Sequence, residues 1–409
     1  MPRLPYAVGM KRLLALLVLT ALSAAAQGQT FTVGGAGGQF AQIQEAIDSP
    51  LVPAGATLMV APGGYASISV TKSLNILSDS GGAFFVGSVS IGPVTDFALV
   101  GARVNTLVVK GVTGRSLIEG CTFSKGPAVL EDCTELLVQR SQFWGQSACY
   151  PDGPVLEATG AADVRNARIV FTDCYFEGGD MVDEYPLDPE LECAEHYPVA
   201  GNPLVISEKS EVVLAGCSLR GYGYPPPFWN PGPPAVLVSD SRVTIRGNQN
   251  HEMRTNTPEI VQMDTLSTLK VSGVTLVASG ISVGQAGLPP AAQVPAIPEP
   301  FLVLGGGVRP GDAIVFELFA PAGAIIINGI SLGEGLLSYP LGSEAFWIDP
   351  SLIWQLSLLI GQGHQAPATL PATLPATPTL AGLKVGVQSL VVDGQNAWLT
   401  NPLQLVLGA

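Results

Sequence analysis

A short phrase recurs along this chain and places a cysteine at the same point each time. The clearest copies are LIEGCTF (117–123), VFTDCYF (170–176) and VLAGCSL (213–219). Each copy is an alternating apolar stretch, then a small or acidic residue, the cysteine, a polar residue and another apolar one. A phrase that recurs once per structural coil is typical of a solenoid, in which stacked coils share one core. The repeat therefore restricts the fold more than any single motif does.

The same position can be followed beyond these three copies. The apolar residue three places before it is in turn Ile76, Leu99, Ile118, Val138, Phe171, Leu214, Ile245 and Val271. A second row of apolar pairs precedes the phrase, at 129–130, 155–156, 205–206, 236–237 and 260–261. Two such rows in matching order predict an all-β fold, a parallel β-helix of about eight coils. A β-sandwich array is the alternative architecture.

The spacing of the first row also predicts where loops are inserted. Successive members lie 23, 19, 20, 33, 43, 31 and 26 residues apart. A bare coil of this fold takes about 20 residues. The excess in the later coils therefore predicts long insertions between Ser141 and Asn248.

Composition agrees with many short strands and excludes some partners. Only 13% of the residues are charged, Gly (48) and Pro (34) are frequent, and the mean hydropathy is +0.37. Low charge with abundant Gly and Pro favours strands and turns over helices. The net charge of −14 argues against nucleic acid or an anionic membrane surface as a partner, because both require clustered Lys and Arg.

The N-terminus has the pattern of a signal peptide over residues 1–26. Lys11 and Arg12 precede an apolar run (13–22), and small residues (23–26) follow. Met10 is an alternative start. An apolar run of about 14 residues is too short for an ordinary transmembrane helix. We therefore expect a secreted protein, extracellular or at the cell surface, with no membrane insertion after cleavage.

Residues 27–65 have the pattern of a cap. QFAQIQEAI (39–47) has helical apolar spacing, and the strand-like TLMVA (57–61) runs into PGGY (62–65). This order resembles the N-terminal cap of right-handed parallel β-helix proteins of the pectin-lyase-like superfamily. The resemblance covers residues 31–65 and implies a helix that covers the open end of the coils.

The remaining boundaries follow from composition. We expect the β-helix over 66–283, a linker over 284–300 that contains five prolines, and a small β-sandwich over 301–409. The segment LAGLKVGVQSLVVDGQNAWLTNPLQLVL (380–407) resembles a C-terminal module common in secreted bacterial proteins. That resemblance implies an extracellular accessory module and no particular chemistry.

The insertions contain most of the chain's unusual polar residues. The candidate catalytic residues are Asp180, Asp183, Glu195, His196 and Arg220. Oxygen-rich clusters can bind Ca²⁺, which pectate lyases of the resembled superfamily use, but the acidic spacing here matches no defined Ca²⁺ loop. We therefore assign no metal site and keep Ca²⁺ only as a candidate cofactor, the alternative being a solvated acidic loop.

Aromatic residues crowd the same insertions. The candidate substrate-binding residues are Trp144, Tyr150, Tyr185, Tyr197, Tyr222, Tyr224 and Trp229. Flat rings can stack on sugars, and the flank of a β-helix is a long surface suited to a polysaccharide. The alternative is that these rings pack the loops onto the coils.

Five of the six cysteines fall into two groups, and the sixth is Cys133. Cys149 and Cys193 lie in neighbouring insertions, where a disulfide would join the two loops. The alternative is two free thiols. Cys121, Cys174 and Cys217 occupy the repeated position, and we expect them to be reduced core residues.

No catalytic signature accompanies this organisation. We find no match to the segments that mark pectin methylesterases or polygalacturonases. We therefore expect a secreted β-helix protein whose long-loop face binds extracellular or cell-wall polysaccharide or another cell-surface glycan, without established catalysis. The alternatives are a divergent polysaccharide lyase or glycoside hydrolase, and a structural or adhesive surface protein.

Overall fold

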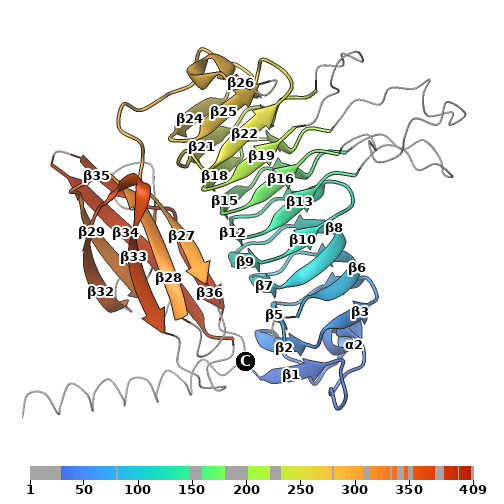
Figure 1. Cartoon of the computed structure of the whole chain (residues 1–409). Coiled ribbons are helices and arrows are strands. Elements are labelled where there is room, and N and C mark those ends of the chain that lie inside the picture. Colours follow the sequence, from blue (N-terminus) through green and yellow to red (C-terminus); the bar gives the residue numbers. More distant parts are fainter. Residues whose placement is uncertain are drawn as a thin grey trace, which may run out of the picture.

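The structure is a computed structural model, and it places most of the chain after the signal-like segment. The described residues are 29–79, 82–146, 159–179, 201–221, 232–278, 281–306, 313–331, 334–338, 345–348, 353–373, 382–394 and 396–406. They form a parallel β-helix followed by antiparallel sheets, as Figure 1 shows. The predicted fold class is confirmed.

The first sheet of the β-helix takes one strand from each coil. In spatial order its ten strands are β1 (Thr30–Val33), β2 (Ala56–Val60), β5 (Leu74–Ser78), β7 (Phe97–Val100), β9 (Arg115–Glu119), β12 (Glu135–Gln139), β15 (Arg168–Thr172), β18 (Glu211–Ala215), β21 (Arg242–Arg246) and β24 (Thr268–Ser272). All of these neighbours pair in parallel.

The second sheet has sixteen strands in two arms, because β6 (Phe84–Ile91) and β8 (Ala102–Lys110) are long enough to belong to both. Arm one contains β3 (Gly63–Tyr65), β10 (Thr122–Phe123), β13 (Gln142–Trp144), β16 (Tyr175–Glu177), β19 (Ser218–Arg220), β22 (Glu252–Thr255), β25 (Thr275–Ala278) and the antiparallel β26 (Ile281–Ser282). Arm two contains β4 (Ile68–Val70), β11 (Ala128–Glu131), β14 (Ala162–Arg165), β17 (Leu204–Ser207), β20 (Val236–Val238) and β23 (Val261–Met263). From β9 to β23, each coil therefore has three strands, one in the first sheet and one in each arm.

The first apolar row of the sequence is confirmed residue by residue. Each of its eight members pairs with the next in register, from Ile76 opposite Leu99 to Ile245 opposite Val271. All eight are at most 3% exposed and belong to the same core.

The second apolar row is only partly right. Val205 lies opposite Leu237 rather than Val236, and the position expected for residue 155 is taken by Asp163 of β14. Residues 155 and 156 lie outside the described residues. Arm-two strands have only three or four residues, so an apolar pair does not define their register to one residue.

The residue before the cysteine turns the chain from the first sheet into arm one. Gly120, Asp173 and Gly216 have positive φ values of 59°, 51° and 63°. Glycine adopts this left-handed conformation without strain, and Asp tolerates it better than most residues. This requirement explains why the repeated phrase has a small or acidic residue at that point.

The cysteines that follow these corners point into the core. Cys121, Cys174 and Cys217 are buried free thiols, as we expected, and so is Cys133. The Cys121 thiol donates to the carbonyl oxygen of Glu119 at 3.3 Å, and burial raises its pKa to about 12. These thiols therefore act as core side chains. The expected disulfide between Cys149 and Cys193 falls outside the described residues.

The expected capping helix is much reduced. It is α2 (Ile43–Asp48), which buries Ile43, Ala46 and Ile47 in the β-helix core. Six residues span about 9 Å, so α2 fills one corner instead of covering the end as a full cap. The helix stops because Ser49 precedes Pro50, and a residue before proline is disfavoured in the helical region.

The C-terminal part is a small antiparallel sandwich. One sheet contains β27 (Phe301–Gly306), β28 (Ala313–Ala320) and β33 (Gly363–Thr373). The other contains β32 (Ile353–Ile360), β29 (Ile325–Ser331), β34 (Lys384–Asp393), β35 (Asn396–Leu399) and β36 (Leu403–Val406). A two-stranded sheet, β30 (Glu334–Ser338) with β31 (Ala345–Ile348), accompanies them. The two larger sheets share one apolar core.

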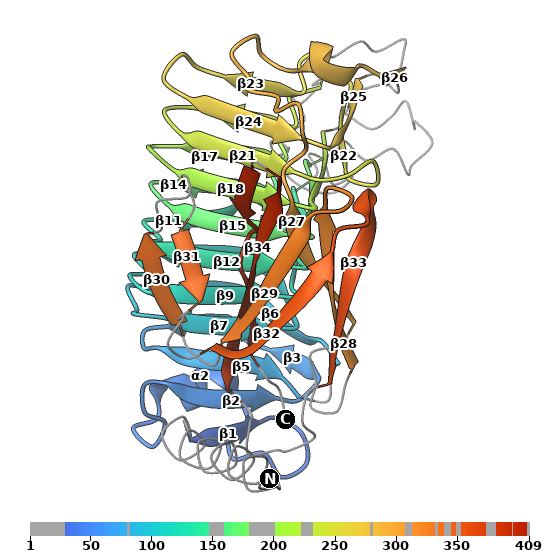
Figure 2. The ribbon, with the colours of Figure 1, turned by 90° about the vertical axis from the view of Figure 1, so that its left-hand side faces the viewer.

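This sandwich docks against the outward face of the first sheet (Figure 2). Outward residues of that sheet, such as Leu117, Leu137 and Val170, are buried together with Val406 of β36. Ala215 packs against Phe301 and other residues of β27 and β28. The first sheet is therefore covered on both faces, which leaves the second sheet as the exposed flank of the β-helix.

The segment expected to be a linker also packs against the β-helix. Gln293 continues the first sheet beside Lys270, and its backbone nitrogen donates to Leu269 at 2.8 Å. Glu299 is 4% exposed and forms ion pairs with Arg246, at 2.9 Å, and with Lys270. The prolines of residues 284–300 thus lead the chain across the last coil and into β27.

Candidate functional site

The three longest insertions leave the β-helix at the same corner. They follow β13, β16 and β19 and return to β14, β17 and β20, so each lies between arm one and arm two. Residues 147–158, 180–200 and 222–231 of these insertions lie outside the described residues. Their first and last residues are described, and they place the three insertions beside one another.

Glycines let the bases of these insertions pack backbone against backbone. The Gly145 nitrogen donates to the carbonyl oxygen of Glu177 at 2.8 Å, and the Gly179 nitrogen donates to that of Thr159 at 3.0 Å. A Cβ at Gly179 would lie 2.1 Å from the carbonyl oxygen of Gln146, which real contacts never reach. The sequence therefore needs glycine here to bring neighbouring insertions together.

A row of polar and aromatic side chains runs along the outward face of arm one, next to this corner. Its strands point Phe143, Phe176, Leu219 and Met253 inward, so the residues on either side point outward. Trp144, Glu177, Arg220 and Arg254 are successive partners in register. With Tyr175 and Glu252 they form what we call the outer strip. At a strand spacing of about 4.8 Å, Trp144 and Arg254 lie about 14 Å apart along the coils.

The aromatic end of the outer strip is a ring pair. The centroids of Trp144 and Tyr175 are 5.3 Å apart with a tilt of 53° between the rings. Both side chains are half-buried. The pair therefore offers an apolar surface in a fixed orientation on a strand rather than on a loop.

Two charged residues of the outer strip, Glu177 and Arg220, act on the Tyr175 hydroxyl. This hydroxyl donates to Oε2 of Glu177. Burial and the Glu177 carboxylate raise the pKa of Tyr175 to about 12, although Arg220 acts in the opposite direction. Two strands further along, on β22, Arg254 Nε pairs with Glu252 Oε1 at 2.7 Å. At neutral pH the site therefore presents a phenol that stays protonated between a carboxylate and a guanidinium.

The same face continues past the outer strip toward the N-terminal coils. Phe85, Arg103, Thr122, Gln142 and Tyr175 are successive partners in register. Phe85 is 50% exposed, and the Arg103 guanidinium lies 5.3 Å from its ring centroid. The outward face of arm one is thus a continuous surface that carries rings and charges on neighbouring strands.

Two of the predicted site residues lie in the outer strip, Arg220 and Trp144. The others lie outside the described residues: Asp180, Asp183, Glu195, His196, Tyr150, Tyr185, Tyr197, Tyr222, Tyr224 and Trp229. Within the described part of the chain, no three His, Cys, Asp or Glu side chains come together as a metal site would require. The acidic stretch that made Ca²⁺ a candidate lies outside the described residues.

Sequence reasoning missed Tyr175, Glu177 and Glu252. Their signal was present, because each flanks an inward apolar residue of a short strand, as Tyr175 and Glu177 flank Phe176. Alternation within VFTDCYFE would have assigned Tyr175 and Glu177 to the outward face. The predicted site was instead placed on the long insertions and not on the strands that contain these residues.

Fold and site together define a class: a parallel β-helix protein with a β-sandwich docked on one face and a solvent-facing aromatic and charged strip on another. No described helix is long and apolar enough to cross a membrane.

Comparison with known proteins adds little beyond this class. No family model matches the sequence, and no curated protein does. One solved structure that is similar to the chain is the enzymatically active domain of tailspike protein 2 of bacteriophage CBA120. It shares 12% identity at a TM-score of 0.30, and the match covers 94% of this chain and 72% of that one. A likeness this distant carries no argument about function.

Proposed function

We propose that this protein binds an extended polysaccharide along the outer strip and does not cleave it. The observation that carries the proposal is the Trp144–Tyr175 ring pair, set beside Glu177 and Arg220 on a continuous sheet face. Aromatic rings can cover the apolar face of a sugar, while carboxylate and guanidinium groups bind its hydroxyls. Because the side chains stand on paired strands, the site requires little ordering when a ligand binds.

The repeat geometry also suits a polymer. Neighbouring strands present side chains every 4.8 Å or so, and the same face extends as far as Phe85. A ligand with repeating units can contact several coils in succession. The signal-like N-terminus supports the placement of this binding outside the cell, on a secreted or cell-wall glycan.

The test is glycan retention by the full chain and two variants. Trp144→Ala and Tyr175→Ala each remove one ring of the pair, and we expect each to weaken binding by tenfold or more on a panel of neutral and uronic-acid polysaccharides. Affinity electrophoresis measures the retention. Leu266→Ala is the matched control, because Leu266 is 72% exposed at a turn away from the outer strip.

If the glycans retain the wild type and both ring variants equally, the outer strip is not the glycan-binding site. If the wild-type chain retains no glycan, a structural or adhesive role takes the place of this proposal.

Polysaccharide cleavage at the same site is the second candidate. It is favoured by one observation: a protonated phenol, Tyr175, contacts the carboxylate of Glu177 beside Arg220. A proton donor and a carboxylate in contact can act as acid and base. Ultraviolet absorbance of unsaturated products and new reducing ends would detect the reaction. Activity that disappears in Glu177→Gln and Tyr175→Phe, while glycan retention persists, would replace binding with catalysis as the main function.

A further inference from the structure

We propose that His251 is a proton-sensitive contact between the β-helix and the sandwich, which docks firmly while the imidazole is neutral and is loosened when acid protonates it. His251 lies in the turn between β21 and β22. Its ring stands nearly perpendicular to the ring of Phe301 in β27, with the centroids 5.6 Å apart. Figure 1 shows β27 on the side of the sandwich that faces the β-helix. A proton on this ring therefore acts directly at the boundary.

The turn that contains His251 is longer than the corresponding corner of the preceding coil. Residues 216–217 separate β18 from β19, whereas residues 247–251 separate β21 from β22. The His251 backbone nitrogen donates to the carbonyl oxygen of Asn248 at 3.0 Å, which closes the turn. The backbone nitrogen of Thr275, in the next coil, donates to the carbonyl oxygen of His251 at 2.9 Å. The ring thus has a defined position.

The hydrogen bond of the ring requires the neutral imidazole. The backbone nitrogen of Asn248 donates to Nδ1 of His251 at 3.1 Å, so Nδ1 is an acceptor and the proton of the neutral ring is on Nε2. A second proton turns Nδ1 into a donor that faces another donor. The turn then loses this bond, which in the neutral state holds the ring against Phe301.

The ring is also enclosed by apolar groups. A Cβ at Gly216 would lie 3.2 Å from His251 Nε2 and 3.0 Å from Cγ1 of Val303, so the glycine allows the coil, the ring and β27 to approach closely. Phe301 is fully buried and stacks on Phe319 at a centroid distance of 4.7 Å. Burial among these groups lowers the pKa of His251.

The charged residues on the elements around this turn form their own pairs. They are Arg246, Glu252, Arg254, Lys270, Glu299 and Glu317. Arg246 and Lys270 both pair with Glu299, and Glu252 pairs with Arg254. β27, FLVLGG, has no charged residue, and Glu317 of β28 acts on Asp173, two coils away. Cys217, in the preceding corner, is a buried free thiol. No described ion pair therefore stabilises a proton on His251.

Acid, and not base, disrupts this contact. An ordinary histidine has a pKa of about 6.5, and docking holds His251 below that value. The contribution of His251 is complete above the pKa of the exposed ring and is lost as the pH falls through the pKa of the docked ring. Glu119 and Asp173 act in the opposite direction at the same boundary, because burial raises their pKa. The effect of His251 must therefore be measured as a difference between two chains at each pH.

The first test is the titration of the full chain by NMR with ring-labelled histidine. The chain has three histidines, so the signals are few, and His251→Gln identifies the signal of His251. We expect its pKa to lie below that of an ordinary histidine. A value at or above the ordinary pKa overturns the proposal.

The second test is hydrogen exchange of the backbone amides of β27. A glutamine at 251 can accept the Asn248 bond but cannot be protonated. Between pH 7 and pH 5, exchange in the wild type is expected to gain on His251→Gln by up to about tenfold per pH unit. Comparison at equal pH cancels the intrinsic pH dependence of exchange.

His364→Gln is the matched control for this experiment. His364 is also half-buried with a lowered pKa, but it lies in β33 of the sandwich, so this variant should keep the wild-type response. A thermal melt at pH 7 verifies that each variant is folded. The proposal is overturned if the wild type and His251→Gln respond equally to acid, or if His364→Gln alone abolishes the response of β27.

Discussion

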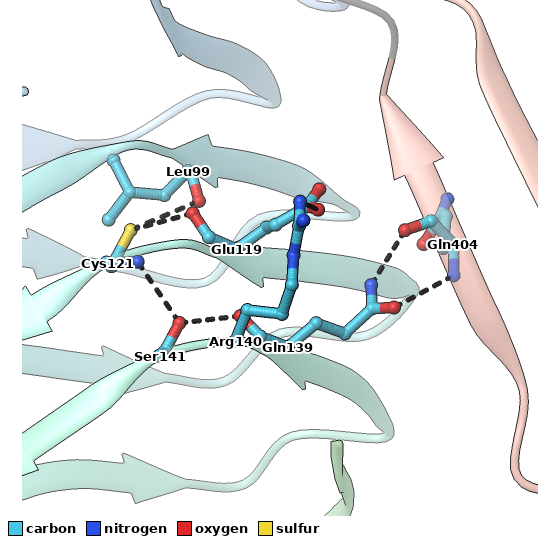
Figure 3. Close-up of polar contacts among 7 residues, drawn as sticks. All are labelled: Leu99, Glu119, Cys121, Gln139, Arg140, Ser141 and Gln404. Atoms are coloured by element: carbon cyan, nitrogen blue, oxygen red, sulfur yellow. Dashed lines mark hydrogen bonds and ion pairs between the residues drawn. The ribbon is translucent and has the colours of Figure 1, made fainter. Parts of the chain in front are cut away.

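Gln139 and Gln404 bond to each other in both directions across the boundary between the β-helix and the sandwich. The Gln139 side-chain nitrogen donates to the backbone oxygen of Gln404 at 2.7 Å, and the Gln404 backbone nitrogen donates to the Gln139 side-chain oxygen at 3.4 Å. Figure 3 shows this pair beside the buried corner that contains Cys121 and Glu119. One turn of the β-helix thus binds the backbone of β36, and Asn401 and Thr172 form a similar link at 3.1 Å.

Replacing Gln139 is therefore expected to weaken the fold. Gln139→Ala removes both hydrogen bonds that its side chain forms with the buried backbone of Gln404, so we expect the free energy of unfolding to fall by about 1 to 3 kcal/mol. Chemical denaturation measures the change. Gln262→Ala, at an exposed position of β23, is the control and should be neutral. If both variants unfold like the wild type, the pair does not contribute to stability.

Two carboxyl groups near this boundary, the buried Glu119 and the partly desolvated Asp173, predict that stability declines as the pH rises. Burial raises the pKa of Glu119 despite the nearby Arg140, and it raises the pKa of Asp173 to about 6. A carboxyl whose pKa is higher in the folded protein favours the protonated state. Its contribution to the stability of the fold is complete below the pKa of the carboxyl in the unfolded chain. That contribution is lost as the pH rises through the pKa of the carboxyl in the folded protein. By surface area Asp173 is an exposed residue, so solvent screening makes its share of the effect much smaller than that of Glu119.

The Glu119→Gln variant tests this sign. It removes a titrating group whose Oε2 has no hydrogen-bond partner, so the decline in stability between pH 4 and pH 8 should become shallower. Denaturation at several pH values measures the slope. Glu259→Gln, at an exposed position, should keep the wild-type slope. A steeper slope in Glu119→Gln would mean that the ion pair with Arg140 outweighs burial.

The glycine-packed bases of the insertions predict a local effect on binding. Gly179→Ala places a methyl group against the backbone of Gln146, so we expect a loss of about 1 to 3 kcal/mol in stability and weaker glycan retention. Gly64→Ala is the matched control, because the space around Gly64 is open and its φ is ordinary. Unchanged stability in Gly179→Ala would show that the insertions can separate without cost.

The contact between Tyr175 and Glu177 predicts a measurable titration. Glu177→Gln removes the negative charge next to the phenol, so the pKa of Tyr175 should fall from about 12 toward its ordinary value. Ultraviolet difference titration against Tyr175→Phe isolates this one phenol. Glu252→Gln removes a carboxylate that pairs with Arg254 instead, and it should leave the titration unchanged. If the pKa of Tyr175 is the same in Glu177→Gln as in the wild type, the contact between Tyr175 and Glu177 is contradicted.

The stacked rings of the core predict a large loss of stability for one substitution. Phe143 lies between Phe123 and Phe176 at centroid distances of 4.9 and 4.8 Å. Phe143→Ala leaves a cavity inside the coils and is expected to cost about 3 to 5 kcal/mol in unfolding experiments. Phe85→Ala, at a 50% exposed position of the same sheet, should cost far less. Similar losses in the two variants would contradict the role of the stack.

The parts of the fold that repeat were predictable. The first apolar row aligned Ile76 through Val271 without error because eight coils reinforce the same position. The predicted apolar row of arm two was off by one residue at Val236, because a strand of three residues contains too little pattern to define its register. The capping helix was overestimated at its start, because the apolar spacing counted Phe40 as helical, whereas Phe40 forms a β-bridge with Val33 and the helix begins at Ile43.

The candidate site was only partly predictable. Trp144 and Arg220 were named from composition, but their grouping with Tyr175 and Glu177 depends on strands from three different coils. The contact between His251 and Phe301 could not be foreseen either, because the two residues meet only when the sandwich docks on the β-helix.

The sequence by itself determined the coil, its inward row and the left-handed corner before each cysteine, because these features depend on local alternation and backbone conformation repeated many times. Only the tertiary structure decided which outward faces are covered. Leu117, Leu137 and Gln139 look like solvent-facing positions within their own strands, yet they are buried by residues that follow more than 200 positions later. Burial of an outward side chain depends on what docks there, and that contact is made only after the coils and the sandwich have formed.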